Sequence, residues 1–218
     1  MSKAKSRPAA QRAKPWWRTR KNRNRVWMSL LIGLVFVAVG GFAWLATQGS
    51  GGMNEPSAGQ QVNAFELPDV ASGQTFSLAD YLGKSDVVVV SYMGFFCSGC
   101  EELLDELQGR QADFEQRGAK LVVLGSLPES LDFARGEAQR RDLTFSLLHD
   151  ADTSVIQELG MWSDGMEMPW MGYLIIDKSG KVAASDLMLS EAPGAGPESV
   201  DMILAALDGA QQAEAPGT

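Results

Sequence analysis

The sequence predicts an α/β domain, a central mixed sheet flanked by helices, preceded by one N-terminal transmembrane helix. Three observations lead to this fold class. The continuous β-branched run Val87–Val90 is typical of a central strand that is buried on both faces. Segments with strand-like and helix-like patterns alternate after this run, which favours an α/β sheet covered on both sides. An uncharged apolar stretch covers residues 26–47.

Charge divides the chain into two unlike parts. Residues 1–25 hold ten of the nineteen Lys and Arg and no acidic residue, and all twenty-seven Asp and Glu lie from Glu55 onward. The net charge of -8 is therefore the sum of a basic tail and an acidic domain. A basic tail can bind nucleic acid, but directly before a membrane span it more often sets topology and contacts lipid. We expect membrane lipid, and no nucleic acid, as its partner.

Residues 26–47 are long enough to cross a bilayer. A helix over this range would span about 33 Å, compared with a hydrocarbon core of about 30 Å. The run exceeds the apolar core of about 7–15 residues in a cleaved signal peptide, and no clean cleavage site follows it. Because the basic residues precede it, the positive-inside rule predicts a single-pass protein of the cytoplasmic membrane. Residues 1–25 would be a cytoplasmic tail, and the acidic domain would be extracytoplasmic.

The rest of the chain is predicted to contain three regions. Residues 48–60 are rich in Gly, Ser and Pro and indicate a flexible linker, residues 61–209 form the globular domain, and residues 210–218 form a disordered tail. Within the domain, sequence patterns predict these elements in order: a hairpin of 65–68 and 74–78, a strand around 87–90, a helix over 101–117, a strand at 120–125, a helix from Pro128 toward Arg141, a short segment at Leu147 and Leu148, a helix over 152–160, a hairpin of 173–177 and 181–184, and a helix over 198–207.

Cys97 and Cys100 are the two cysteines of the chain, and two residues separate them. A disulfide across so short a loop removes little entropy from the unfolded chain, so it is better suited to reversible redox chemistry than to stabilisation. The pair lies between the first central strand and the next helix, as in a thioredoxin-like fold. There the helix N-terminus would favour a thiolate at Cys97, and Cys100 would lie one turn away on the same face.

Acidic residues close to the motif oppose a strongly activated thiolate. Glu101 and Glu102 follow Cys100 at once, and no Lys, Arg or His is near in sequence. The direction of electron flow therefore stays open. His149, the single histidine, could shuttle protons or bind a metal, but an ordinary loop position is the simpler interpretation.

Other uses of the cysteine pair are less consistent with the sequence. Structural zinc needs four ligands, whereas the chain has two cysteines and one histidine. Haem attachment needs a histidine directly after the second cysteine, where Glu101 stands. A Cu(I) site could use methionine thioethers, although these side chains more simply fill a loop or form a soft apolar surface. The methionines concerned are Met161, Met166, Met168 and Met171. We expect neither a metal nor another cofactor.

Several stretches resemble known families. VVVVSYMGFFCSGCEELLDEL, residues 87–107, resembles the strand–CxxC–helix entry of thioredoxin-like proteins. FELPDVASGQTFSLADYLGK, residues 65–84, resembles the opening of the alkyl hydroperoxide reductase/thiol-specific antioxidant (redoxin) superfamily, and residues 114–130, 145–162 and 173–182 follow the order of its peroxiredoxin-like members. An anchor combined with CxxC is similar to the extracytoplasmic thiol–disulfide oxidoreductases of cytochrome c maturation.

The resemblance implies two enzymatic functions. In the leading hypothesis, the protein exchanges disulfides with protein thiols: Cys97 attacks, Cys100 resolves the mixed disulfide, and a membrane or soluble thiol carrier supplies electrons. In the alternative, it is a thiol-dependent peroxidase with antioxidant activity, in which Cys100 attacks a hydroperoxide and Cys97 resolves. A Cu(I)-handling protein of thioredoxin fold is the third hypothesis.

Two family positions are occupied by unexpected residues. Peroxiredoxins carry Thr three residues before the peroxidatic cysteine, and Cys97 stands there if Cys100 is matched to that cysteine. They also carry Arg six residues before the aspartate of the last hairpin turn, and the thioredoxin branch has a cis-proline at the same place. Counting back six from Asp177 gives Met171, and the nearest proline is Pro169. If Pro169 is that cis-proline, Trp170 and the methionines would line the rim near the cysteines, where a partner protein would dock.

Overall fold

A computed structural model describes residues 55–125, 130–187 and 197–214 of the chain. The predicted basic tail, the predicted transmembrane helix and the first part of the predicted linker lie outside these ranges. Within them, no helix is both long enough and apolar enough to cross a bilayer.

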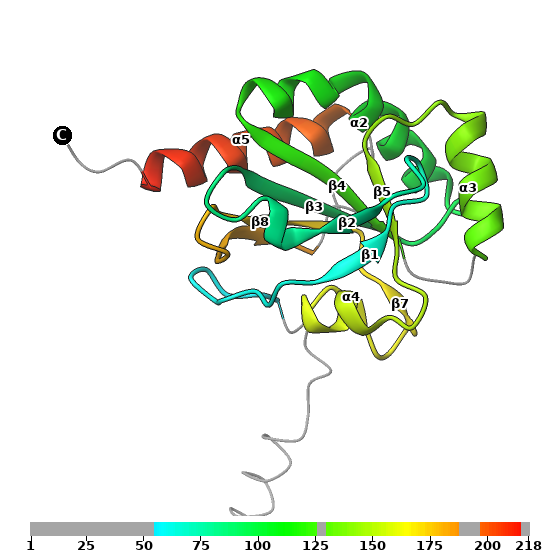
Figure 1. Cartoon of the computed structure of the whole chain (residues 1–218), viewed down its shortest axis with the longest axis horizontal. Helices are drawn as coiled ribbons and strands as arrows, with labels where there is room; N and C mark the ends of the chain where they lie inside the picture. Colours follow the sequence, from blue (N-terminus) through cyan, green and yellow to red (C-terminus); the bar gives the residue numbers. More distant parts are fainter. Residues whose placement is uncertain (1–54, 126–129, 188–196, 215–218) are drawn as a thin grey trace, which may run out of the picture. The chain divides into compact units, whose positions relative to one another are not determined.

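A five-stranded mixed sheet forms the centre of the domain (Figure 1). Its strand order is β5 (Ser146–His149), β4 (Ala119–Gly125), β3 (Asp86–Tyr92), β8 (Gly172–Ile176) and β9 (Val182–Asp186). β3 pairs in parallel with β4 and antiparallel with β8, so it is the central strand. All its residues are buried, which confirms the prediction made from its continuous β-branched run.

Alternate residues of the central strands enter two separate cores. Val88 and Val90 of β3 join Cys100 in one cluster, whereas Val87 and Val89 point into the other. This alternation follows from the period of two in a strand. Because both faces are covered, a strand with an apolar residue at every position is stable here.

Helices cover the first face, and a short hairpin with one small helix covers the second. α2 (Ser98–Gln116), α3 (Leu131–Arg140) and α5 (Pro197–Glu214) contribute to the cluster that contains Cys100. α2 and α5 lie side by side (Figure 1), and Arg117, the C-cap residue of α2, binds Asp208 of α5 at 2.7 Å. The opposite face holds the antiparallel pair β1 (Glu66–Pro68) and β2 (Thr75–Ser77), the 3-10 helix η2 (Leu78–Asp80) and α4 (Ser154–Glu158). A separate small hairpin is formed by β6 (Trp162–Ser163) and β7 (Met168–Pro169).

The N-terminal part of the domain also contacts both edges of the sheet. At β9, the backbone N–H of Gly59 donates to Val182 O at 2.8 Å, and Val182 N–H donates to Gln60 O at 2.9 Å. At β5, Val70 N–H donates to Leu147 O at 2.8 Å. The predicted linker over 48–60 is therefore too long, because its last residues are already paired with the domain.

Two predicted helix boundaries also differ from the structure. α5 continues to Glu214, five residues into the predicted disordered tail, because the Gln211 amide donates to Asp86 Oδ2 and to Arg117 O, each at 2.8 Å. The helix expected to open at Pro128 begins at Leu131 instead. Ser130 is its N-cap, and the Ser130 hydroxyl accepts the Phe133 N–H at 3.2 Å. Pro128 itself lies outside the described ranges.

Candidate active site

Cys97 lies at the N-terminus of α2, where the end of β3 turns into the helix. It is the N-cap residue, with an extended backbone, and its sulfur accepts the backbone N–H of Cys100 at 3.3 Å. Its side chain is half-buried. Unpaired N–H groups at a helix start stabilise negative charge. Cys97 is therefore placed at the helix N-terminus where molecules from solvent can reach its sulfur.

Cys100 lies one turn further along α2 and is fully buried. Burial, followed by the hydrogen bond with the Cys97 side chain, raises the pKa of the Cys100 thiol to about 12. At neutral pH this thiol keeps its proton. The two cysteines therefore differ in their access to solvent, although both belong to one short motif.

Met171, the residue directly before β8, packs against Cys100 of the motif. Its Sδ lies 3.7 Å from Cys100 Sγ, and its side chain is buried. The backbone on both sides of Met171 is held by Ser91 of β3, whose hydroxyl lies 2.6 Å from Trp170 O and 3.4 Å from Gly172 O. Pro169 instead pairs with Trp162 in the small β6–β7 hairpin.

Aromatic side chains surround the loop that leads to Cys97. Phe95 packs edge-on against Tyr92 and against Phe133 of α3, with ring centroids 5.6 and 6.3 Å apart. Phe96, the residue before Cys97, has 61% of its surface exposed, and Phe133 has 50%. The entrance to the motif therefore presents apolar surface to solvent.

Arg141 is a site residue that the sequence did not indicate. It follows α3, and its guanidinium binds Glu101 at 2.8 Å and Asp105 at 2.9 Å on the first two turns of α2. The same group lies over the Phe95 ring, 5.7 Å from its centroid. Arg141 therefore offsets two of the acidic charges that oppose a thiolate at the motif. Forty residues separate it from Glu101, so no local pattern could reveal this contact.

The remaining candidates are dispersed. His149 ends β5, and burial lowers the pKa of its imidazole. Met161 is buried in the cluster on the opposite face of the sheet from Cys100, while Met166 is exposed. The four methionines therefore do not form one site. Across the described ranges, no three His, Cys, Asp or Glu side chains converge as metal ligands.

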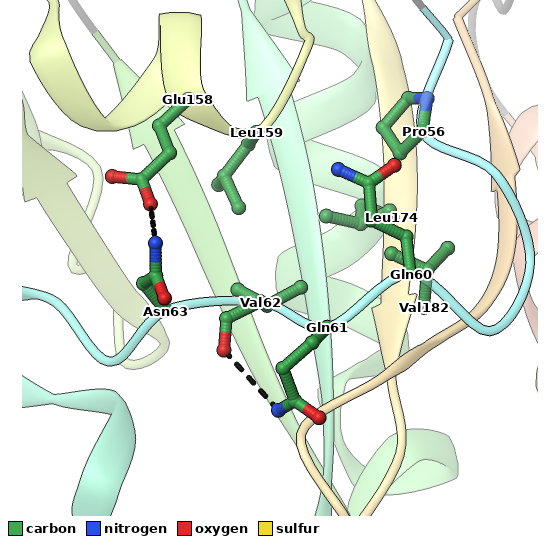
Figure 2. Close-up of a pocket in the computed structure, with 9 residues that line it drawn as sticks. All are labelled: Pro56, Gln60, Gln61, Val62, Asn63, Glu158, Leu159, Leu174 and Val182. Carbon is green, nitrogen blue, oxygen red and sulfur yellow. Dashed lines mark hydrogen bonds between the residues drawn. The ribbon is translucent and has the colours of Figure 1, made fainter.

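A separate pocket of about 160 Å³ lies between residues 56–63, α4 and strands β8 and β9 (Figure 2). Gln60 and Gln61 line it, and the Asn63 amide donates to the Glu158 carboxylate at its rim. Its apolar wall includes Leu174, which belongs to the cluster on the face opposite Cys100. Neither cysteine lines this pocket, so it is distinct from the redox motif.

Comparison with known proteins identifies the family. Residues 58–185 match the model of the AhpC/TSA family, which covers more than half of the chain. The chain belongs to the AhpC/TSA family. This membership confirms the superfamily resemblance of the sequence and makes the protein a thiol-dependent oxidoreductase.

Individual relatives of this AhpC/TSA protein are peroxiredoxins. The putative peroxiredoxin Bcp of Haemophilus influenzae is 30% identical over 112 residues, which are 51% of this chain and 70% of that protein. Peroxiredoxin Bcp of Escherichia coli is 28% identical over 139 residues, which are 60% of this chain and 85% of that protein.

Solved structures support the same thioredoxin-like architecture. Peroxidoxin BcpB from Mycobacterium tuberculosis has a TM-score of 0.61 and 23% identity, and the match covers 71% of this chain and 98% of that one. A reduced 2-Cys peroxiredoxin from Plasmodium vivax has a TM-score of 0.61 and 20% identity, over 72% of this chain and 98% of that one. At these identities the likeness shows the fold alone.

Proposed function

We propose that this AhpC/TSA protein is a thiol-dependent peroxidase in which Cys97 is the attacking thiol and Cys100 is the resolving thiol. The observation that carries the assignment of roles is the difference between the two side chains. Cys97 is accessible and caps the helix, whereas Cys100 is fully buried and has a raised pKa. The peroxiredoxin relatives support a hydroperoxide as the oxidising substrate.

The proposed cycle needs only the two cysteines and an external dithiol. The Cys97 thiolate attacks one peroxide oxygen, the O–O bond breaks, and the departing alkoxide or hydroxide takes a proton from solvent. Cys97 is now a sulfenic acid. The Cys100 sulfur then loses its proton and attacks the Cys97 sulfur, the S–O bond breaks, and water leaves as the disulfide forms. An external dithiol reduces this disulfide and is itself oxidised.

This assignment reverses the roles that family alignment alone suggests for the peroxidase. Matching Cys100 to the peroxidatic cysteine would require a fully buried thiol to meet the peroxide. A thiol with a pKa of about 12 is also almost entirely protonated at neutral pH, and the thiolate is the nucleophile. Both considerations favour Cys97 as the first cysteine to react.

A second candidate function, disulfide exchange with protein substrates, is favoured by the surroundings of Cys97. If Cys100 is matched to the peroxidatic cysteine of the family, Cys97 stands where Thr is expected, and Met171 stands where Arg is expected. Neither of these two positions then supplies the polar group expected to bind a peroxide. Phe96, next to Cys97, is largely exposed. An accessible thiol beside an apolar rim suits a protein disulfide.

One experiment separates the two reactions. The reduced full-length protein in detergent would be supplied with one dithiol reductant and assayed both for hydroperoxide consumption and for insulin disulfide reduction. Peroxide turnover well above insulin reduction supports the peroxidase, and the reverse result supports exchange.

The assignment of roles has its own test. In Cys100→Ser, peroxide should leave a sulfenic acid at Cys97 that a dimedone-type reagent labels and mass spectrometry locates. Cys97→Ser should give no label and no turnover. A sulfenic acid at Cys100 in the Cys97→Ser variant would show that the roles are the opposite of those proposed.

We also propose that this chemistry takes place outside the cytoplasmic membrane. The support is the uncharged stretch over 26–47 and the ten basic residues before it. In intact spheroplasts, an externally added protease should remove the domain. Protection of the domain, with cleavage only after lysis, would contradict this location.

A further inference from the structure

We propose that the sulfurs of Cys97, Cys100 and Met171 form a binding site for Cu(I) in the reduced protein. This site goes beyond the proposed redox function, which uses only the two cysteines. It also differs from the methionine-rich loop site considered from the sequence, because it uses only Met171, whose Sδ lies 3.7 Å from Cys100 Sγ.

Two of the three sulfur atoms already have the spacing of ligands to one ion, and the third is on the same helical turn. Cys100 Sγ is 3.7 Å from Met171 Sδ, and the Cys97 sulfur accepts the backbone N–H of Cys100 at 3.3 Å. Metal–sulfur bonds of about 2.3 Å would place two sulfur ligands of one ion about 4 Å apart. The Cys100–Met171 pair therefore has close to the spacing that a shared metal needs, without movement of the backbone.

The donor set selects the kind of ion. Two thiolates and one thioether are soft ligands, which suit Cu(I) better than ions that prefer oxygen or imidazole. Zinc in structural sites takes four ligands from Cys, His, Asp or Glu, and no three of these converge in the described ranges. The inner side of the site, around Cys100 and Met171, is apolar and buried, so two of the three sulfur ligands are shielded from water.

The site is also rigid on the methionine side. Ser91 ties the backbone on both sides of Met171 to the central strand β3. Met171 is a flexible residue type, but here its side chain is almost fully buried against Cys100. A ligand that is already positioned loses little conformational entropy when the metal binds.

Binding is a ligand exchange and involves no electron transfer. Cu(I) enters, the two thiols release two protons, and the thioether binds without losing one. Because binding releases these protons, affinity should rise with pH. Metal binding and formation of the Cys97–Cys100 disulfide use the same sulfurs, so bound Cu(I) should block the redox cycle.

The test uses the reduced full-length protein in detergent under anaerobic conditions. Cu(I) would be titrated against a competing Cu(I) chelator, and X-ray absorption would count the sulfur ligands of the bound ion. We expect one Cu(I) per chain with a shell of three sulfurs. Met171→Leu should bind at least about tenfold more weakly and show two sulfurs.

Met161→Leu is the matched control, since Met161 is equally buried but lies in the cluster on the other face of the sheet. It should leave affinity and coordination unchanged. Failure to compete with the chelator, or a two-sulfur shell in the wild-type protein, would overturn the proposal even if Met171→Leu did not fold. Peroxide and insulin assays of the metal-free protein test the redox function separately.

Discussion

The hydroxyl of Ser91 donates a hydrogen bond of 2.6 Å to the carbonyl oxygen of Trp170. This contact joins the end of the central strand β3 to the segment that carries Met171. It therefore fixes the residue that faces Cys100 from outside the CxxC motif. Ser91 is itself fully buried, so no water competes for the bond.

Ser91→Ala should lower the free energy of unfolding by about 1–3 kcal/mol, because it leaves a buried carbonyl without its hydroxyl partner. Urea denaturation measures the change. Ser199→Ala is the control: Ser199 is equally buried, but its hydroxyl has no hydrogen-bond partner among the residues described. That variant should be neutral or more stable. Equal losses in both variants would show that the Ser91 bond has no special role.

Gly125→Ala should disturb the aromatic residues below the active-site loop. A Cβ at this position would lie 2.3 Å from Tyr92 Cε1, and Tyr92 packs against Phe95. Such overpacking costs about 1–3 kcal/mol and should also slow alkylation of Cys97. Gly109→Ala, in an exposed part of α2 with open space around it, should stabilise the protein by about 0.5–1 kcal/mol. A stable Gly125→Ala with unchanged Cys97 reactivity would contradict the steric argument.

Arg141→Gln should destabilise the protein and reduce the reactivity of Cys97. The Arg141 side chain is 11% exposed, whereas its partners Glu101 and Asp105 are 38% and 67% exposed, so we expect a loss of about 1–3 kcal/mol. Without it, two carboxylates near the motif lose their cationic partner, and alkylation of Cys97 at one fixed pH should be slower.

Arg135→Gln is the comparison for Arg141. Arg135 also belongs to α3, but it is 43% exposed and binds Asp132 of the same helix. Its loss should cost less than about 0.5 kcal/mol and leave Cys97 alkylation unchanged. If the two variants behaved alike, the contact with α2 would not matter. In Arg141→Gln, adding Glu101→Gln and Asp105→Asn should restore the wild-type rate of Cys97 alkylation.

His149 should make stability depend on pH just below neutrality. Burial lowers the pKa of His149 from its ordinary value of 6.5, so the unfolded chain binds this proton at a higher pH than the folded chain. The contribution is fully present above pH 6.5 and is lost as pH falls through it toward the folded value. Unfolding measured between about pH 7.5 and about pH 5.5 should show a smaller decrease in His149→Gln than in the wild type. An NMR titration of this single histidine that gave a pKa above 6.5 would contradict this account.

Much of the fold could be predicted because its elements are encoded locally. The continuous valines of β3, the helical spacing of Leu103, Leu104 and Leu107, and the Lys178–Gly180 turn each specify their element without reference to distant residues. The end of α5 could not be predicted in this way. Gln211 is polar and suggests a frayed tail, but its amide is bound to Asp86 and Arg117, residues distant in the sequence.

The candidate site shows the same division. The CxxC spacing and its place between a strand and a helix indicated Cys97 and Cys100. Met171 stands out because the family resemblance leads us to expect Arg there, but its contact with Cys100 was not predicted. The difference in burial between the cysteines could not be predicted, because it depends on packing against Met171 and the surrounding core. Arg141 reaches the site only through the position of α3.

The pairing of residues 59–70 with both edges of the sheet has a consequence for self-association. An open edge strand is a template on which another chain can add its own strand. Here Gly59 and Gln60 occupy part of the β9 edge, and Val70 occupies part of the β5 edge. A chain shortened to begin at Phe65 would keep the cysteines and most of the core, yet would expose Val182 backbone groups. Such a fragment should be prone to intermolecular strand addition. The residues just before Phe65 therefore limit aggregation by covering the edge of β9.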